Sequence, residues 1–126
     1  MDLSLRTDGA LATLRVAGAV ALGETGALAD YLRVARENGA VWAVVDLGGC
    51  SELPTTIVAV LSREADRFAA AGGSLGLCGV GAQNPFLTDA ARDGRFPHFR
   101  TLEEAVAAGR AARLPAEAPA PATPAE

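Results

Sequence analysis

A short apolar run that ends in two glycines constrains the fold of this chain more than any other feature. The run extends from Val41 to Leu47, with Asp46 as its one charged residue, and Gly48 and Gly49 follow it directly. Such a run is typical of a central strand that is covered on both faces of a sheet. An apolar helical pattern begins at Pro54, so we expect the strand to end at the glycine pair and turn directly into a helix.

Two threonine hydroxyls, on Thr55 and Thr56, stand at or near the start of that helix. A helix start offers unpaired backbone N–H groups and the positive end of the helix dipole, which favour a hydroxyl or a phosphate. The structural interpretation makes Ser51 the N-cap and the threonines first-turn residues. The functional alternative is a regulatory hydroxyl, where phosphorylation would add about two negative charges and three acceptor oxygens.

The N-terminal third of the chain predicts two further strands and a helix. Residues 3–7 and 14–16 alternate between apolar and polar side chains, and the intervening Asp8-Gly9 is a hairpin turn signal. We therefore expect an antiparallel pair of strands. Apolar residues then recur at helical spacing from Leu28 to Ala35, and Asn38-Gly39 supplies a C-terminal stop.

The central helix is predicted from Pro54 to Ala71, with Gly72-Gly73 ending it. Its polar residues Arg63, Glu64 and Arg67 are expected to turn outward, because its apolar residues gather on the other face. The apolar residues of that face are Ile57, Val60, Leu61, Ala65 and Phe68.

The C-terminal part predicts shorter elements and a tail. Residues 75–80 read as a short strand, residues 85–91 as a short helix, and residues 96–99 as an edge strand, because Pro97 would break a central one. The sequence Thr101-Leu102-Glu103-Glu104 is a capping box that opens a last helix.

Strands and helices therefore alternate in the order β-β-α-β-α-β-α-β-α. This order predicts a single α/β domain over residues 1–113, with a mostly parallel sheet, an antiparallel N-terminal strand and helices packed against it. Residues 114–126 are dominated by proline and alanine. Such a composition cannot bury enough apolar surface to offset its ordering entropy, so we predict a disordered tail there.

Composition argues against several classes of function. The formal charge of −4 disfavours nonspecific nucleic-acid binding, which needs a clustered basic surface. All eleven basic residues are arginine, so neither a Schiff-base lysine nor a P-loop lysine is present. No apolar run approaches the roughly 20 residues that span a bilayer, and charged residues interrupt any signal peptide. We expect a cytoplasmic protein that binds neither nucleic acid nor membranes.

Side chains suited to catalysis or metal binding are scarce. His98 is the only histidine and has no evident oriented partner, so we expect a surface or packing role. Cys50 and Cys78 each end an apolar strand-like run and are expected to be buried hydrophobes. The spacing of metal ligands is absent, and the glycines of residues 72–81 do not form a dinucleotide fingerprint. We therefore expect no enzymatic activity, no metal and no cofactor.

Residues 44–61 resemble the core of STAS domains, the fold of bacterial anti-sigma factor antagonists. The family pattern is an apolar strand, Asp-Leu-Ser-Gly-Val, a short spacer, then Asp-Ser-Ser-Gly-Leu-Gly and a helix. This chain has Asp46-Leu47-Gly48-Gly49 and, after the spacer, Pro54-Thr55-Thr56-Ile57. Residues 95–105 are similar to the family's closing Leu-Phe-Pro-Val-Phe-Asp-Ser-Leu-Glu-Glu-Ala. The resemblance extends over about residues 3–110 and implies the STAS fold, whose element order is the one predicted above.

The resemblance also implies a regulatory protein-binding module. The family's phosphoacceptor falls on Thr55, and its neighbour falls on Thr56. The module would dock on an anti-sigma factor or a serine/threonine kinase, and phosphorylation of Thr55 would end docking by placing charge in the interface. The residues implied in docking are Gly48, Gly49, Ser51, Glu52, Pro54, Thr55, Thr56, Ile57 and Ala59.

Three positions depart from the family pattern. Pro54 replaces an aspartate, Ile57 replaces a glycine, and Ala21 replaces the aspartate of the first loop. Pro54 fixes the backbone before Thr55 and removes a carboxylate, while Ile57 adds a branched side chain where partners would approach. These departures favour an alternative, a constitutive, non-phosphorylated STAS scaffold in a signalling assembly. A third interpretation is a small-ligand or nucleotide-binding STAS domain that uses the helix start as an anion site.

Overall fold

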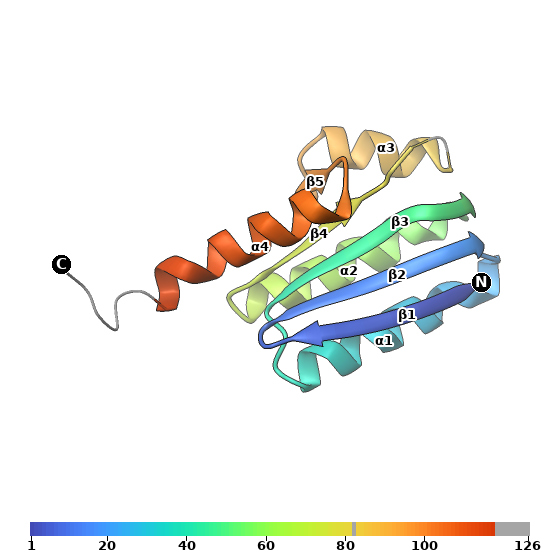
Figure 1. Ribbon diagram of the computed structural model, residues 1–126. Coiled ribbons are helices and arrows are strands. Elements are labelled where there is room, and N and C mark those ends of the chain that lie inside the picture. Colours follow the sequence, from blue (N-terminus) through green and yellow to red (C-terminus); the bar gives the residue numbers. More distant parts are fainter. Residues whose placement is uncertain (82, 118–126) are drawn as a thin grey trace.

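A five-stranded mixed sheet forms the centre of the computed structural model, which describes residues 1–81 and 83–117 (Figure 1). The strands, in the order in which they lie side by side, are β1 (Asp2–Asp8), β2 (Leu11–Ala19), β3 (Trp42–Glu52), β4 (Ser74–Cys78) and β5 (His98–Phe99). β1 is antiparallel to β2, and the remaining neighbours are parallel. The predicted α/β fold with an antiparallel N-terminal strand is therefore confirmed.

Helices cover both faces of this sheet. They are the 3₁₀ turn η1 (Leu22–Glu24), α1 (Thr25–Glu37), α2 (Thr56–Ala70), α3 (Pro85–Arg92) and α4 (Leu102–Glu117). In Figure 1, α1 and α2 lie behind the sheet and α4 crosses in front of it. Within the described residues, no helix combines the length and apolarity that crossing a membrane requires.

Helix α4 extends beyond the predicted domain boundary. It continues to Glu117, so residues 114–117, which we predicted to begin the tail, belong to the helix. Helix propensity does not account for this extension, because Pro115 lacks the backbone N–H that a helix interior uses. The rest of the predicted tail, residues 118–126, lies outside the described residues.

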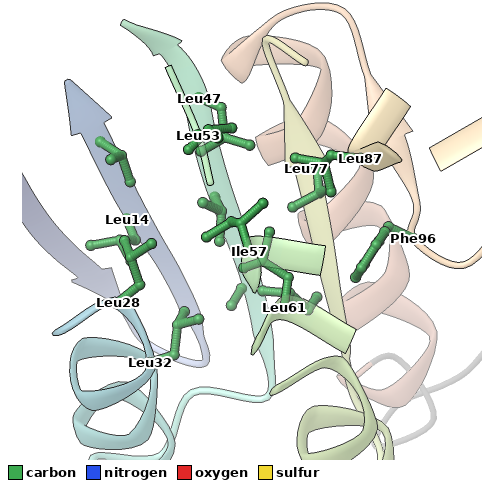
Figure 2. Packing of buried hydrophobic residues seen from close by; sticks show 14 of the residues in the cluster. Leu14, Leu28, Leu32, Leu47, Leu53, Ile57, Leu61, Leu77, Leu87 and Phe96 are labelled. Carbon is green, nitrogen blue, oxygen red and sulfur yellow. The ribbon is translucent and has the colours of Figure 1, made fainter. Parts of the chain in front are cut away.

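Each face of the sheet has its own apolar core. The larger one joins the sheet to Leu28 of α1, Ile57 of α2 and Leu87 of α3 (Figure 2). On the other face, Trp42 of β3 packs with Ala105 of α4. Strand β3 is thus buried on both sides, as its apolar run predicts.

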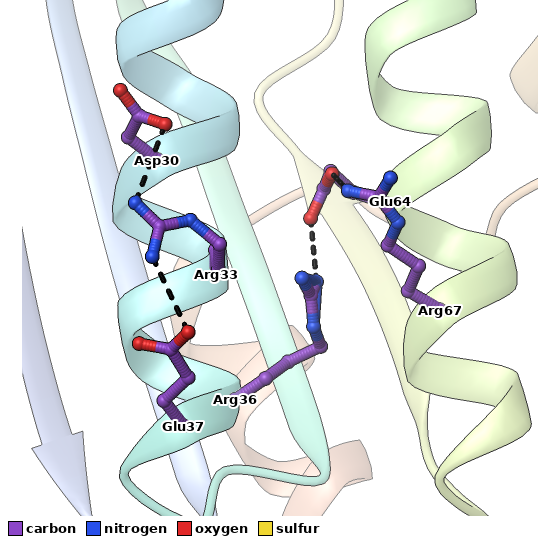
Figure 3. Close-up of polar contacts among 6 residues, drawn as sticks. All are labelled: Asp30, Arg33, Arg36, Glu37, Glu64 and Arg67. Carbon is purple, nitrogen blue, oxygen red and sulfur yellow. Dashed lines mark hydrogen bonds and ion pairs between the residues drawn. The ribbon is translucent and has the colours of Figure 1, made fainter.

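The buried face of α2 includes one residue that we expected to be exposed. Arg63 and Arg67 are exposed, as predicted, but Glu64 is fully buried. Its two carboxylate oxygens accept hydrogen bonds from Arg36 of α1 at 2.6 Å and from Arg67 at 2.8 Å (Figure 3). Its charge led us to expect it outside, although helical spacing puts position 64 on the same face as Ile57, Leu61 and Phe68. Packing of α1 alongside α2 covers it, and the two guanidinium groups supply the partners that a buried carboxylate needs.

Candidate docking site

Strand β3 continues past the glycine pair, which corrects the predicted turn. It reaches Glu52 because β2 keeps pairing with it, with Ala17 opposite Gly49. The backbone N–H of Val20 donates to the Glu52 carbonyl at 3.0 Å. Ser51 therefore lies in the strand with its side chain exposed and is not a helix N-cap.

Helix α2 begins after a short connection. Thr55 is its N-cap residue and Thr56 is its first residue, so the helix starts two residues later than predicted. The Thr55 side chain makes no capping hydrogen bond, and both threonines are exposed. A hydroxyl that is not committed to capping, at the positive end of the helix dipole, is chemically suited to accept a phosphate.

The predicted docking residues belong to two consecutive segments, the end of β3 and the first turn of α2. Seven of them are exposed and Pro54 is partly buried; the exposed ones are Gly48, Gly49, Ser51, Glu52, Thr55, Thr56 and Ala59. Ile57 is the exception, since it is fully buried in the larger core. This burial matches the place of Ile57 on the predicted apolar face of the helix. The expectation that the Ile57 side chain stands where a partner would approach is therefore wrong.

Asn84 fixes the connection between β3 and α2, a role that we did not predict. Its amide nitrogen donates to the carbonyls of Leu53 at 3.2 Å and Pro54 at 2.9 Å. Its amide oxygen accepts from the backbone N–H groups of Phe86 at 2.9 Å and Leu87 at 3.2 Å. One buried side chain thus caps α3 and ties it to the segment that leads into α2. An Asn-Pro pair before a helical pattern is an N-cap signal that points to this residue.

Gln83 holds the ends of β3 and β4 in a similar way. Its amide nitrogen donates to the carbonyls of Leu47 and Gly79, both at 3.0 Å, and its oxygen accepts from the N–H of Gly81 at 2.6 Å. Gly79 lies so close to β3 that a Cβ there would stand 2.4 Å from the backbone nitrogen of Gly48. The two strand ends are therefore held by a side-chain amide and by direct backbone packing.

A groove between α2 and α3 adds apolar surface beside Thr55. Its volume is about 790 Å³, and Phe86, which is 60% exposed, contributes to its wall. The other apolar side chains are Val58, Ala59 and Ala90, and the charged ones are Asp89, Asp93 and Arg95. A large exposed aromatic side chain in a shallow apolar groove is typical of protein-docking surfaces.

The two cysteines lie in the interior, and the single histidine lies on the surface. Cys50 and Cys78 are buried, as predicted. Desolvation, reinforced by the nearby Asp46 carboxylate, raises the pKa of the Cys50 thiol to about 11 and that of Cys78 to about 12. His98 is exposed on β5. Over residues 1–81 and 83–111, no group of three metal-ligating side chains comes together.

Comparison with protein-family models gives no match, and no curated protein matches the sequence. Solved structures do match. An anti-sigma factor antagonist from Mycobacterium paratuberculosis superposes with a TM-score of 0.74 at 18% identity, over 86% of this chain and 93% of that one. The unphosphorylated form of the anti-sigma factor antagonist SpoIIAA gives 0.70 at 14% identity, over 86% and 98% of the two chains.

The phosphorylated form of SpoIIAA, a Bacillus cell fate determinant, gives a TM-score of 0.68 at 13% identity, over 83% of this chain and 96% of that one. These superpositions cover 83–86% of this chain and 93–98% of the compared chains. The fold implied by the sequence resemblance is thereby confirmed. This chain has the STAS fold, the fold of the anti-sigma factor antagonists.

Proposed function

We propose that this chain is a regulatory protein-binding module that docks on an anti-sigma factor or a serine/threonine kinase through the end of β3 and the start of α2. The observation that carries the proposal is the exposed Thr55, which lies at the N-cap of α2 without a capping hydrogen bond and borders the apolar groove. The choice of partner is supported by the shared fold with proteins described as anti-sigma factor antagonists.

Phosphorylation of Thr55 would switch docking off. A phosphate adds about −1.5 to −2 charge at neutral pH. The helix dipole favours this charge, so α2 stays folded. Asp89 and Asp93 already line the adjoining groove, and the added phosphate would make this surface strongly negative. A partner that fits the unmodified surface would then be repelled. Thr56, which is also exposed, is the second candidate for the same modification.

A constitutive scaffold is the alternative, and the connection before Thr55 favours it. Pro54 leaves that connection without the carboxylate of the family pattern, and Asn84 binds the Pro54 carbonyl at 2.9 Å. The hydrogen bonds of Asn84 to the Leu53 and Pro54 carbonyls tie this connection to α3. In this alternative the docking surface is the same, but no modification controls it.

Affinity capture with three immobilised forms of this chain distinguishes the phosphorylation switch from the constitutive scaffold. Wild type and Thr55→Glu are compared with Ala69→Glu, which adds the same charge at an exposed position near the other end of α2. We expect wild type and Ala69→Glu to retain an anti-sigma factor or a kinase, and Thr55→Glu to lose it. Retention by Thr55→Glu would support the scaffold instead. If wild type retains no protein of these classes, the docking proposal is wrong.

A further inference from the structure

The outer side of strand β1 has no partner strand in the described part of the chain. β1 lies at the edge of the sheet and pairs only with β2. An edge strand presents a row of backbone N–H and C=O groups that can pair with another strand. β1 has seven residues and contains neither proline nor glycine, so its backbone can form a regular ladder with another strand.

The side chains of β1 fit a second copy of the same strand in one register. Leu3 and Leu5 pack against the larger core, so Asp2, Ser4 and Arg6 lie on the opposite face. If two copies pair antiparallel about a two-fold axis at Ser4, Asp2 of each copy stands opposite Arg6 of the other. On the core side, Leu3 of each copy then stands opposite Leu5 of the other. Opposite charges and apolar pairs directly across two strands are both stabilising.

The neighbouring registers lack this match. Outward-pointing backbone groups recur at every second residue of a strand, so the next allowed antiparallel pairings have their axis at Leu5 or at Leu3. An axis at Leu5 sets Asp2 opposite Asp8 of the other copy, and like charges in that position are destabilising. An axis at Leu3 sets Asp2 opposite Ser4 and forms no ion pair. Charge therefore selects the axis at Ser4.

Helix α1 carries exposed apolar side chains on the same side of the molecule. Tyr31 is 39% exposed and Val34 is 40% exposed. Arg36 reaches toward α2, where it meets Glu64 (Figure 3). At about 100° per residue, Tyr31 and Val34 lie roughly 140° and 160° around the helix from Arg36. They therefore face away from α2, toward the side on which the sheet ends at β1 (Figure 1).

We propose that the chain forms a homodimer in which β1 pairs antiparallel with β1 of a second copy about an axis at Ser4. The two sheets become one continuous sheet, and Tyr31 and Val34 of the two α1 helices flank the join. This interface does not rest on the function proposed for Thr55, because β2 and β3 lie between β1 and the start of α2 in the sequence of strands.

A charge-swap experiment tests the register directly. The dimer dissociation constant is measured by analytical ultracentrifugation for wild type, Asp2→Arg and Arg6→Asp. Each variant faces two like-charge pairs in its own dimer, so we expect each to raise the dissociation constant by about tenfold or more. When the two variants are mixed, the new arginine of one chain faces the new aspartate of the other, and we expect a heterodimer of near wild-type affinity. A monomeric wild type, unchanged single variants or the absence of the heterodimer would overturn the proposal.

Two controls sharpen the result. Asp8→Arg changes a charge that has no opposite charge in this register, so the dissociation constant should not change; a stronger dimer would place the axis at Leu5 and overturn the register. Asp8 pairs with Arg110 at 3.1 Å, but both side chains are exposed, so folding should tolerate the change. The double variant Tyr31→Ser, Val34→Ser should weaken the dimer several-fold, and an unchanged constant would remove α1 from the interface.

Discussion

Glu64 is a carboxylate in the packed space between α1 and α2, and two arginines make its burial tolerable. Glu64→Ala would leave Arg36, whose side chain is 17% exposed, without its partner. We expect a loss of about 3–5 kcal/mol in the free energy of unfolding, measured by urea denaturation. Glu37→Ala is the matched control, because its ion pair with Arg33 at 3.3 Å is exposed and should contribute about 0.5 kcal/mol or less. Equal losses in the two variants would contradict this account.

The two buried thiols should make stability depend on alkaline pH. Desolvation, with a contribution from Asp46, raises the pKa of Cys50 from 9.0 to about 11 and that of Cys78 to about 12. Between these values the unfolded chain loses thiol protons that the folded chain keeps. The contribution of the two thiols to the free energy of unfolding is therefore fully present below pH 9. It is lost as the pH rises toward the pKa values of the folded state.

Few other side chains titrate in this pH range, because the chain contains no lysine and one tyrosine. Denaturant unfolding at several pH values between about 8 and 10.5 measures how steeply the free energy of unfolding falls with pH. The double variant Cys50→Ala, Cys78→Ala should flatten it. A slope that the substitutions leave unchanged would show that other groups cause the alkaline loss.

At the level of the elements, the ends of β3 and β4 can lie close together because Gly79 has no side chain. A Cβ there would stand 2.4 Å from the nitrogen and 2.6 Å from the Cα of Gly48, and Gly79 has a φ of +72°. Gly72 is the control, because its φ is +86° but no atom lies within 4 Å of its Cβ position. Both alanine substitutions incur the left-handed backbone strain of about 1–2 kcal/mol.

Gly79→Ala should incur about 1–3 kcal/mol more than Gly72→Ala, because the neighbouring strand must also move. Thermal and urea unfolding of the two variants measure the difference. Losses of the same size would mean that the backbone contact between Gly79 and Gly48 adds nothing to stability.

The joint between α3 and the start of α2 depends on Asn84. Asn84→Ala removes both the cap of α3 and the two bonds to the Leu53 and Pro54 carbonyls, and should cost about 1–3 kcal/mol. Asn84→Asp keeps the capping acceptor but loses the donor to those carbonyls. The Ile57 N–H, which donates to Pro54 at 3.0 Å, should exchange its hydrogen faster in both variants. Unchanged exchange at Ile57 in Asn84→Asp would show that Asn84 does not hold this segment.

Across the whole molecule, local patterns predicted the elements, and tertiary contacts decided the exceptions. The Asp8-Gly9 turn, the stop after α1 and the burial of β3 are local properties of the chain, and each was predictable. The extension of β3 to Glu52 was not, because it depends on continued pairing with β2. Helical spacing places Glu64 on the buried face of α2, but its partner Arg36 belongs to another helix, which no local pattern indicates.

In the candidate site, too, local patterns predicted some features and tertiary contacts decided others. The resemblance located Thr55 and Thr56, and the structure places both on the surface at the start of α2. The inward direction of Ile57 follows from its helical spacing with Leu61 and Phe68, which had already placed it on the apolar face. Asn84 and Gln83 act on backbone carbonyls more than 30 residues away in the sequence. No periodicity reports contacts at that separation, although the Asn-Pro cap signal was visible.

Mapping of phosphate by mass spectrometry is the sharpest test of the proposal that Thr55 controls docking. Wild type, Thr55→Ala and Thr56→Ala are each incubated with ATP and the kinase that wild type captures. The account predicts phosphate on Thr55 in wild type and in Thr56→Ala, and none at the helix start in Thr55→Ala. Phosphate on Thr56 alone, or none on either threonine while partner binding persists, would contradict the claim that Thr55 controls docking.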